Sequence, residues 1–161
     1  MRTHILAGFF LLCIALPACA AQPAADFQPE QLRGFARTDL AIERRGGRDT
    51  FRVWLASTPA EQQQGLMWIR RLPAHQGMLF LLDAPRPMDM WMKNTYVPLD
   101  MLFFDATGRI SHIRARTEPL SEEFISSGGE VAGVLELLAG EASRRGIREG
   151  DRILLPPVRS R

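Results

Sequence analysis

The side chains best suited to chemistry gather in one short segment of the chain. They are an aromatic ring, a cation, an amide, a hydroxyl and a carboxylate, carried by Trp91, Lys93, Asn94, Thr95 and Asp100. Such a set can line a polar pocket for a small anionic or hydroxylated ligand, with the indole ring as a stacking wall. The competing interpretation is structural: Asn94 and Thr95 close a turn, and Lys93 pairs with Asp100.

Two cations are candidates for this pocket. Lys93 is the only lysine among the 20 basic residues of the chain, so a compact ammonium at this position is a candidate requirement of the site. Arg70 follows a predicted helix and joins the pocket if the end of that helix packs nearby. A hydrolase or lyase would use Asp100 as its acid or base, with Lys93 or Arg70 as the electrostatic partner.

Methionine occupies alternate positions just before this segment. In an extended chain Met88, Met90 and Met92 share one face. Their thioethers are candidate copper ligands, although methionine also fills irregular apolar cores. The only histidines beyond the N-terminal segment, His75 and His112, belong to no zinc-protease or serine-hydrolase motif. We therefore expect no catalytic residue, no bound metal and no cofactor.

The composition excludes several classes of protein. The chain has 161 residues, of which 46% are hydrophobic and 24% charged, as in one globular domain of ordinary composition. Its 20 basic and 18 acidic residues leave a formal charge of +2. This balance provides no basic footprint for nucleic acid, so we expect no nucleic-acid partner.

The N-terminus has the pattern of a secretory signal, which we place at residues 1–20. A basic start precedes an apolar run that is too short to cross a bilayer, and small residues follow. Two processing routes remain open. Cleavage at the Ala-Cys-Ala sequence of 18–20 would release a soluble periplasmic protein, whereas residues 16–19 look like a lipobox, in which Cys19 is lipidated. Either route exports the protein, and only the second gives it a membrane contact, through the lipid.

The cysteines and the polar stretches suggest how the rest of the chain is divided. Both cysteines, Cys13 and Cys19, lie in the signal segment, so the mature domain has no thiol for a disulfide, a nucleophile or a metal site. We expect a flexible tether at 21–38, a single globular domain at 39–155 and a short tail at 156–161.

Local patterns predict the elements that must position the candidate side chains. Leu40–Arg44 and Phe51–Ala56 alternate like the two strands of a hairpin, with glycines in the turn between them. The sequence Thr-Pro-Ala-Glu at 58–61 is typical of a helix N-terminus with a capping box. We expect this helix to run to about Met67.

The remaining elements are short. Strands are predicted at 77–82, 99–105, 109–116, 131–138 and 152–155, with extended chain at 88–93, a long loop at 118–130 and a short helix at 140–146. The expected fold is α+β and β-rich: a compact curled sheet or barrel of about seven to eight short strands with one or two short helices.

Several motifs resemble one bacterial and archaeal family. They are EQQQGLMWIRRL at 61–72, GMLF at 77–80, WMKNT at 91–95, PLD at 98–100 and LEL at 135–137. Together they look like the family called domain of unknown function 192, over about residues 39–155. The resemblance implies a small β-rich domain that is often exported, and it implies no activity.

The chain departs from the pattern of that family at two positions. Met90 stands where members often have an aromatic residue, and Ile69 stands where the G-L-M-x-R motif has arginine. The nearest guanidinium groups belong to Arg70 and Arg71, one and two places later.

From the residues we expect an exported, non-catalytic module of the cell envelope that binds an unknown small molecule or an envelope protein. Three alternatives remain. One is the enzyme that uses Asp100 with Lys93 or Arg70, and another is a copper-binding protein with a Met-rich strand. The third is an interaction protein in which the Trp91 segment only holds the fold.

Overall fold

The structure, a computed structural model, describes residues 27–155 of the chain. The predicted signal segment with its lipidation candidate Cys19, the first part of the predicted tether and the tail at 156–161 lie outside these residues. No helix between residues 27 and 155 is long and apolar enough to span a membrane.

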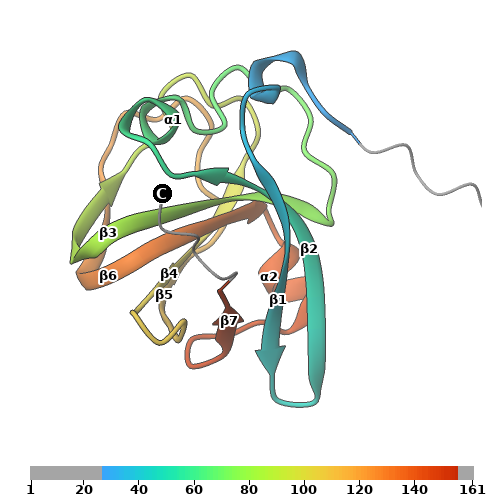
Figure 1. The fold of residues 1–161 in the computed structure, drawn as a ribbon, viewed down its shortest axis with the longest axis vertical. Helices are drawn as coiled ribbons and strands as arrows, with labels where there is room; N and C mark the ends of the chain where they lie inside the picture. Colours follow the sequence, from blue (N-terminus) through green and yellow to red (C-terminus); the bar gives the residue numbers. More distant parts are fainter. Residues whose placement is uncertain (1–26, 156–161) are drawn as a thin grey trace, which may run out of the picture.

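Seven strands form one curled sheet, a half-barrel (Figure 1). Their order across the sheet is β5-β4-β6-β3-β2-β1-β7. The strands are β1 (Arg37–Arg44), β2 (Gly47–Ala56), β3 (Gln76–Met90), β4 (Leu99–Phe104), β5 (Ile110–Arg114), β6 (Ile125–Leu138) and β7 (Arg152–Leu154). The described helices are α1 (Pro59–Gln64), α2 (Glu141–Arg145) and the 3-10 helix η1 (Glu30–Leu32). The predicted β-rich α+β fold is confirmed.

The curl brings the two edges of the sheet together. At the start of β5, the Ile110 N–H donates to the Asp151 carbonyl, and the Ile110 carbonyl accepts from the Gly150 N–H, both at 2.8 Å. The Ile153 N–H of β7 donates to the Gly108 carbonyl at 2.7 Å. These bonds satisfy backbone groups that an open sheet edge would leave exposed.

β1 and β2 form the predicted hairpin. The chain reverses at Arg45 and Gly46, and the φ of 93° at Gly46 is a conformation that favours glycine. Across the hairpin, Arg44 Nε donates to the Asp49 carboxylate at 2.6 Å. The turn therefore contains two residues, whereas the sequence pattern predicted a connection of five residues.

The predicted helix start is confirmed at α1. The Glu61 N–H donates to the Thr58 hydroxyl, and the Thr58 N–H donates back to the Glu61 carboxylate, which is a complete capping box. The helix ends at Gln64 instead of near Met67, because Gly65 leaves helical geometry with a φ of 49°.

β3 is one long strand where the sequence predicted two extended pieces. It continues through Pro85 and Pro87, and its register with β6 shifts between Leu81 and Arg86 and again after Pro87. Proline has no N–H to donate to the ladder, so it is accommodated where the strand bulges.

β6 begins inside the loop predicted at 118–130. Ile125 pairs with Met90 and Glu130 pairs with Pro87, so the second half of that predicted loop is strand. This stretch is rich in serine and glycine and has no hydrophobic period, and its pairing with β3 rather than its own pattern makes it a strand.

The packed fold also begins earlier than residue 39. η1 and the start of β1 lie within the predicted tether of 21–38, and Leu32 and Phe35 are buried in the core. Two isolated apolar side chains create no periodic pattern, so their burial, and not a local propensity, orders this part of the chain.

The core consists of two apolar clusters on opposite faces of the central strands. In β3, Met78 and Phe80 belong to one cluster and Leu79 to the other, as the two-residue period of a strand requires. The segment after α1 packs on the first cluster and α2 on the second. Both neighbours of Glu136 in β6 belong to the second cluster, so Glu136 faces the first.

β3 and β6 approach so closely that glycine is required where they meet. A Cβ on Gly133 would overlap the carbonyl oxygen of Phe80 and lie 2.7 Å from the ring of Phe104. Gly129 lies in the same strand, but no heavy atom is within 4 Å of the place where its Cβ would be.

We expect Gly133→Ala to lower the free energy of unfolding by at least about 1–3 kcal/mol, because only a backbone shift can relieve the overlap. Gly129→Ala is the matched control, and it should change that free energy by less than about 1 kcal/mol. Urea unfolding followed by tryptophan fluorescence measures both values. Equal losses in the two variants would contradict the close approach.

Candidate functional site

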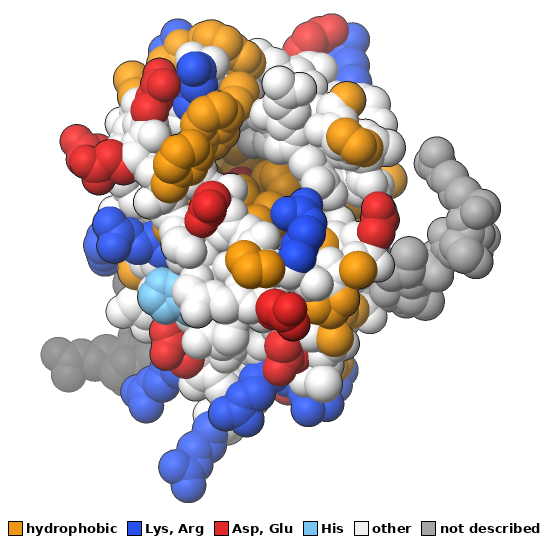
Figure 2. Space-filling view, turned by 90° about the vertical axis from the view of Figure 1, so that its left-hand side faces the viewer, with side chains coloured by type: hydrophobic (Ala, Val, Ile, Leu, Met, Phe, Trp, Pro, Cys, Tyr) orange, Lys and Arg blue, Asp and Glu red, His pale blue; other side chains and the backbone are white. Residues whose placement is uncertain are grey.

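A pocket of about 210 Å³ lies between α1 and β3. We call it the Glu136 pocket; it is lined by residues 62–67, Phe80, Arg86, Met88, Asp89, Met90, Trp91, Lys93, Thr95 and Glu136. Figure 2 shows this side of the molecule hollowed, with apolar side chains inside the hollow and charged side chains near it. The lining therefore combines the end of α1, the bulged half of β3 and the Trp91 segment.

Glu136 is the acid that lies deepest in the protein among those lining the pocket. Only 3% of its surface is exposed, and its strand neighbours in the register are Met78 of β3 and Met101 of β4. No described residue donates a hydrogen bond to its carboxyl group or forms an ion pair with it. Buried polar groups are nearly always paired, so this carboxyl is available to a group that enters the pocket.

Burial raises the pKa of Glu136 to about 8. Arg86 and Lys93 line the same pocket, but neither offsets the effect of burial. At pH 7 the side chain is therefore mostly a neutral carboxylic acid, which can both donate and accept a hydrogen bond.

The α1 side of the pocket is tied to the rest of the fold at two points. Gln62 Nε2 donates to the Leu81 carbonyl at 2.9 Å, which holds the helix against β3. The Trp68 N–H donates to the Asn94 carbonyl at 2.8 Å, which joins the chain after α1 to the Trp91 segment. Trp68 and Asn94 both have positive φ, 69° and 55°, an uncommon conformation that clusters at functional sites.

Asn94 and Thr95 close a turn and also line cavities. The Thr95 N–H donates to the Met92 carbonyl at 3.0 Å, and the Thr95 hydroxyl donates to the Lys93 carbonyl at 3.3 Å. Lys93 Nζ lies 3.4 Å from the Glu122 carboxylate and 5.3 Å from the centre of the Trp91 ring. The partner of Lys93 is therefore Glu122, and not Asp100 as the structural interpretation of the sequence suggested.

A second cavity of about 450 Å³ adjoins the pocket. We call it the tryptophan groove; it is lined by Ala60, Gln63, Gln64, Met67, Trp68, Trp91, Lys93 and Asn94, five of which also line the Glu136 pocket. Trp68 is 48% exposed, and the Trp91 ring stacks on the exposed ring of Phe124 with 6.1 Å between centroids. The two cavities thus share one wall.

The structure does not bring Arg70 or Asp100 to this place. The Arg70 guanidinium lies 4.4 Å from the centre of the Tyr96 ring and does not line the pocket. Asp100 is fully buried, and its carboxylate accepts from the Arg116 N–H at 2.9 Å and from the Ala142 N–H of α2 at 3.0 Å. Asp100 therefore holds a helix and a loop together, and the predicted pairing of Asp100 with either cation is absent.

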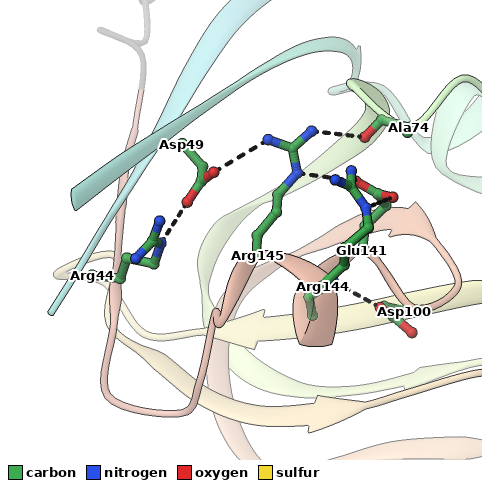
Figure 3. Close-up of polar contacts among 8 residues, drawn as sticks. Arg44, Asp49, Ala74, Asp100, Glu141, Arg144 and Arg145 are labelled. Carbon is green, nitrogen blue, oxygen red and sulfur yellow. Dashed lines mark hydrogen bonds and ion pairs between the residues drawn. The ribbon is translucent and has the colours of Figure 1, made fainter. Parts of the chain in front are cut away.

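Charged side chains around α2 connect this helix to neighbouring elements (Figure 3). Arg145 joins three elements: its guanidinium contacts Glu141 Oε2 at 3.0 Å, Asp49 Oδ1 at 3.2 Å and the Ala74 carbonyl at 3.4 Å. A hydrogen bond from Arg44 and another from Arg145 lower the pKa of Asp49. Partial burial of Glu141 acts to raise its pKa, but the hydrogen bonds from Arg144 and Arg145 outweigh burial and lower the pKa.

The three methionines that are candidate copper ligands do not all line the same cavity. Met88 and Met90 line the Glu136 pocket together with Met67, whereas Met92 does not. The Met92 sulfur is buried and lies 3.1 Å from the Thr117 hydroxyl. All three belong to the first apolar cluster, as the core interpretation of the sequence states.

Sequence reasoning did not single out Glu136, which is the polar centre of the pocket. One signal was present: Glu136 is the only charged residue in the apolar run from 131 to 138. An acid inside a buried strand is rare unless it is paired or functional. That signal could have marked Glu136 before its surroundings were known.

The chain is similar to a protein family and to two solved structures. The family model DUF192, described as "Uncharacterized ACR", matches residues 41–155. A crystal structure of a protein of unknown function from Novosphingobium aromaticivorans DSM 12444 is 36% identical, with a TM-score of 0.75, over 84% of this chain and 94% of that one. A proposed transcription regulator from Sinorhizobium meliloti 1021 is 42% identical, with a TM-score of 0.72, over 74% and 93%. No curated protein matches the chain.

We expect Asp100→Ala to lower the free energy of unfolding by about 2–4 kcal/mol, because the buried N–H of Ala142 and the partly buried N–H of Arg116 lose their acceptor. Asp89→Ala is the control, since Asp89 is an exposed acid that accepts no hydrogen bond from the described residues. It should cost less than about 0.5 kcal/mol. Chemical denaturation measures both, and similar losses would contradict the structural role of Asp100.

The pKa of Glu136 gives the wild-type protein a distinct pH dependence. An acid whose pKa is higher in the folded than in the unfolded protein contributes to the free energy of unfolding, and the contribution is fully present below the unfolded pKa. It is lost as the pH rises through the folded pKa. We expect the free energy of unfolding to fall by up to about 1.4 kcal/mol per pH unit between pH 5 and 8.

Glu136→Gln should remove this slope, because the amide does not titrate. The other titratable groups are the same in both proteins, so the difference between the two pH profiles isolates Glu136. Urea midpoints at half-unit pH steps measure the slope. Parallel pH profiles for the two proteins would refute the buried, unpaired state of Glu136.

Proposed function

The chain belongs to the DUF192 family of uncharacterised proteins, and we propose that it is an exported cell-envelope module that binds a small ligand in the Glu136 pocket without converting it. One observation carries this proposal: a carboxyl group that is buried and unpaired among the described residues lines an open pocket. A buried group without a partner costs about 1–3 kcal/mol, and a ligand that pairs with it recovers that cost on binding. Perturbed acids in pockets are functional-site candidates for this reason.

Trp91, Lys93 and Thr95 support the proposal because they add an aromatic face, a cation and a polar turn to the same pocket. Asn94 faces the adjoining groove. Pockets with mostly apolar walls and a few fixed polar groups are typical of small-molecule sites. Arg70 and Asp100 are not part of the proposed site.

Acid–base catalysis is the second candidate function. A carboxyl group with a pKa of about 8 suits a general acid at neutral pH. However, the lining includes no serine, cysteine or histidine, and its one hydroxyl, on Thr95, donates to a backbone carbonyl. Asp89 and Lys93 also line the pocket, but Lys93 pairs with Glu122 and no hydrogen bond among the described residues joins either of them to Glu136. We therefore favour binding over conversion.

Export is proposed on the sequence alone. The basic start, the apolar run and the small residues at 18–20 favour a cleaved signal, and Cys19 favours a lipid anchor. The two routes give mature proteins of different mass, starting either at Ala21 or at a lipidated Cys19.

Native mass spectrometry of the protein purified from its own cell envelope tests both proposals. We expect the wild type to carry one small molecule and Glu136→Leu to carry none, because leucine removes the carboxyl group and preserves an apolar core. Asp83→Asn, at an exposed acid of β3 outside the pocket lining, is the control that should retain the molecule. The denatured mass reads the mature N-terminus.

Two results would count against binding at this pocket. One is a wild-type protein without any bound molecule, and the other is the same bound molecule on Glu136→Leu. A mature mass that retains residues 1–20 would count against export.

A further inference from the structure

We propose that the Glu136 pocket selects a small organic amine, whose protonated nitrogen pairs with Glu136 and whose apolar tail extends into the tryptophan groove. This inference rests on the proposed binding function and adds the chemical class of the ligand. It follows from what the pocket lacks, from the side chains of its walls and from the cavity next to it.

No cation of the described lining pairs with the buried acid. Arg86 and Lys93 line the pocket, but neither forms an ion pair or a hydrogen bond with the Glu136 carboxyl, and burial raises the pKa of that carboxyl. An ionised carboxylate in an apolar place is costly unless a cation pairs with it. A ligand ammonium supplies both the missing charge and up to three hydrogen-bond donors.

The walls suit a cation with an organic body. Phe80 and Trp91 add aromatic rings to the lining, and Met67, Met88 and Met90 add polarizable thioethers. Aromatic faces attract ammonium groups, and thioethers adapt to ligands of irregular shape.

The charged groups of the lining besides Glu136 are Arg86, Lys93 and Asp89, with a net formal charge of +1. An ionised Glu136 brings the lining to zero, so Glu136 supplies the charge that offsets a bound ammonium. Glu122, outside the lining, pairs with Lys93 at 3.4 Å and reduces its repulsion of an incoming ammonium. These are the charged groups that face the pocket from β3, from the Trp91 segment and from β6; the α1 side contributes only uncharged glutamines.

The tryptophan groove gives the ligand its second part. It shares the wall of Met67, Trp91 and Lys93 with the pocket, and Trp68 forms its exposed side. A tail of several carbon atoms that leaves the pocket along this wall buries apolar surface against two indole rings, at roughly 25 cal/mol per Å². The ligand is therefore amphiphilic.

Binding must release a proton near neutral pH. The free pocket holds Glu136 as the neutral acid, and the amine arrives already protonated. Formation of the carboxylate–ammonium pair transfers the carboxyl proton to the buffer, so one proton is released for each amine bound. Affinity for the amine therefore rises with pH between about 6 and 8.

Isothermal titration of the full mature protein with n-hexylamine and with 1-hexanol tests the proposal, because the two probes differ only in the polar head. We expect the amine to bind at least about tenfold more tightly. Its binding enthalpy should vary with the ionisation enthalpy of the buffer, corresponding to one released proton, whereas that of the alcohol should not. In Glu136→Gln, both the preference and the proton release should vanish.

The outcomes separate this inference from the proposed function. Equal binding of the two probes, or a preference that persists in Glu136→Gln, would overturn the amine assignment and leave a small-ligand pocket. No binding of either probe to folded protein would overturn both. Quenching of tryptophan fluorescence that is lost in Trp68→Ala would support the tail position, and unchanged affinity in that variant would overturn it.

Discussion

The close pairing of β3 with β6 is the constraint on which the rest of the structure depends. These strands, of 15 and 14 residues, are the longest in the sheet and lie side by side in it. At Gly77 and Gly133 the backbones meet with no space for a side chain. Because β3 supplies one wall of the pocket and β6 supplies Glu136, the same contact that sets the strand spacing also sets the place of the carboxyl group.

The pocket adds a local conflict to an otherwise consistent fold. Strand alternation sends Glu136 toward the cluster that contains Met78 and Phe80, where an apolar side chain would pack better. Conflicts between local chemistry and global fold are expected at functional sites, where stability is reduced in exchange for activity. The positive φ of Trp68 and of Asn94, which line the adjoining tryptophan groove, is a second conflict of the same kind.

Sequence reasoning succeeded where a few neighbouring residues determine the structure. The capping box at Thr58 and the β1–β2 hairpin are of this type, and the Trp91 segment borders both cavities because its residues are adjacent in the chain. Sequence reasoning failed where the structure depends on contacts between residues that are far apart in the chain. The start of β6 depends on β3, and Asp100 follows the segment closely yet binds the amides at α2. Glu136 was missed because its role depends on which strand face is covered.

The strand order has a consequence for how the chain folds. β1, the first strand of the sheet, lies between β2 and β7, the last described strand, and Ile42 pairs with Ile153. Contacts between the two ends of a sequence require closure of a very long loop, which slows folding. The sheet cannot be completed until the C-terminal strand has been synthesised and is free to pair. Until then β1 has a paired neighbour on one side only, so completion of the sheet is a late step of folding.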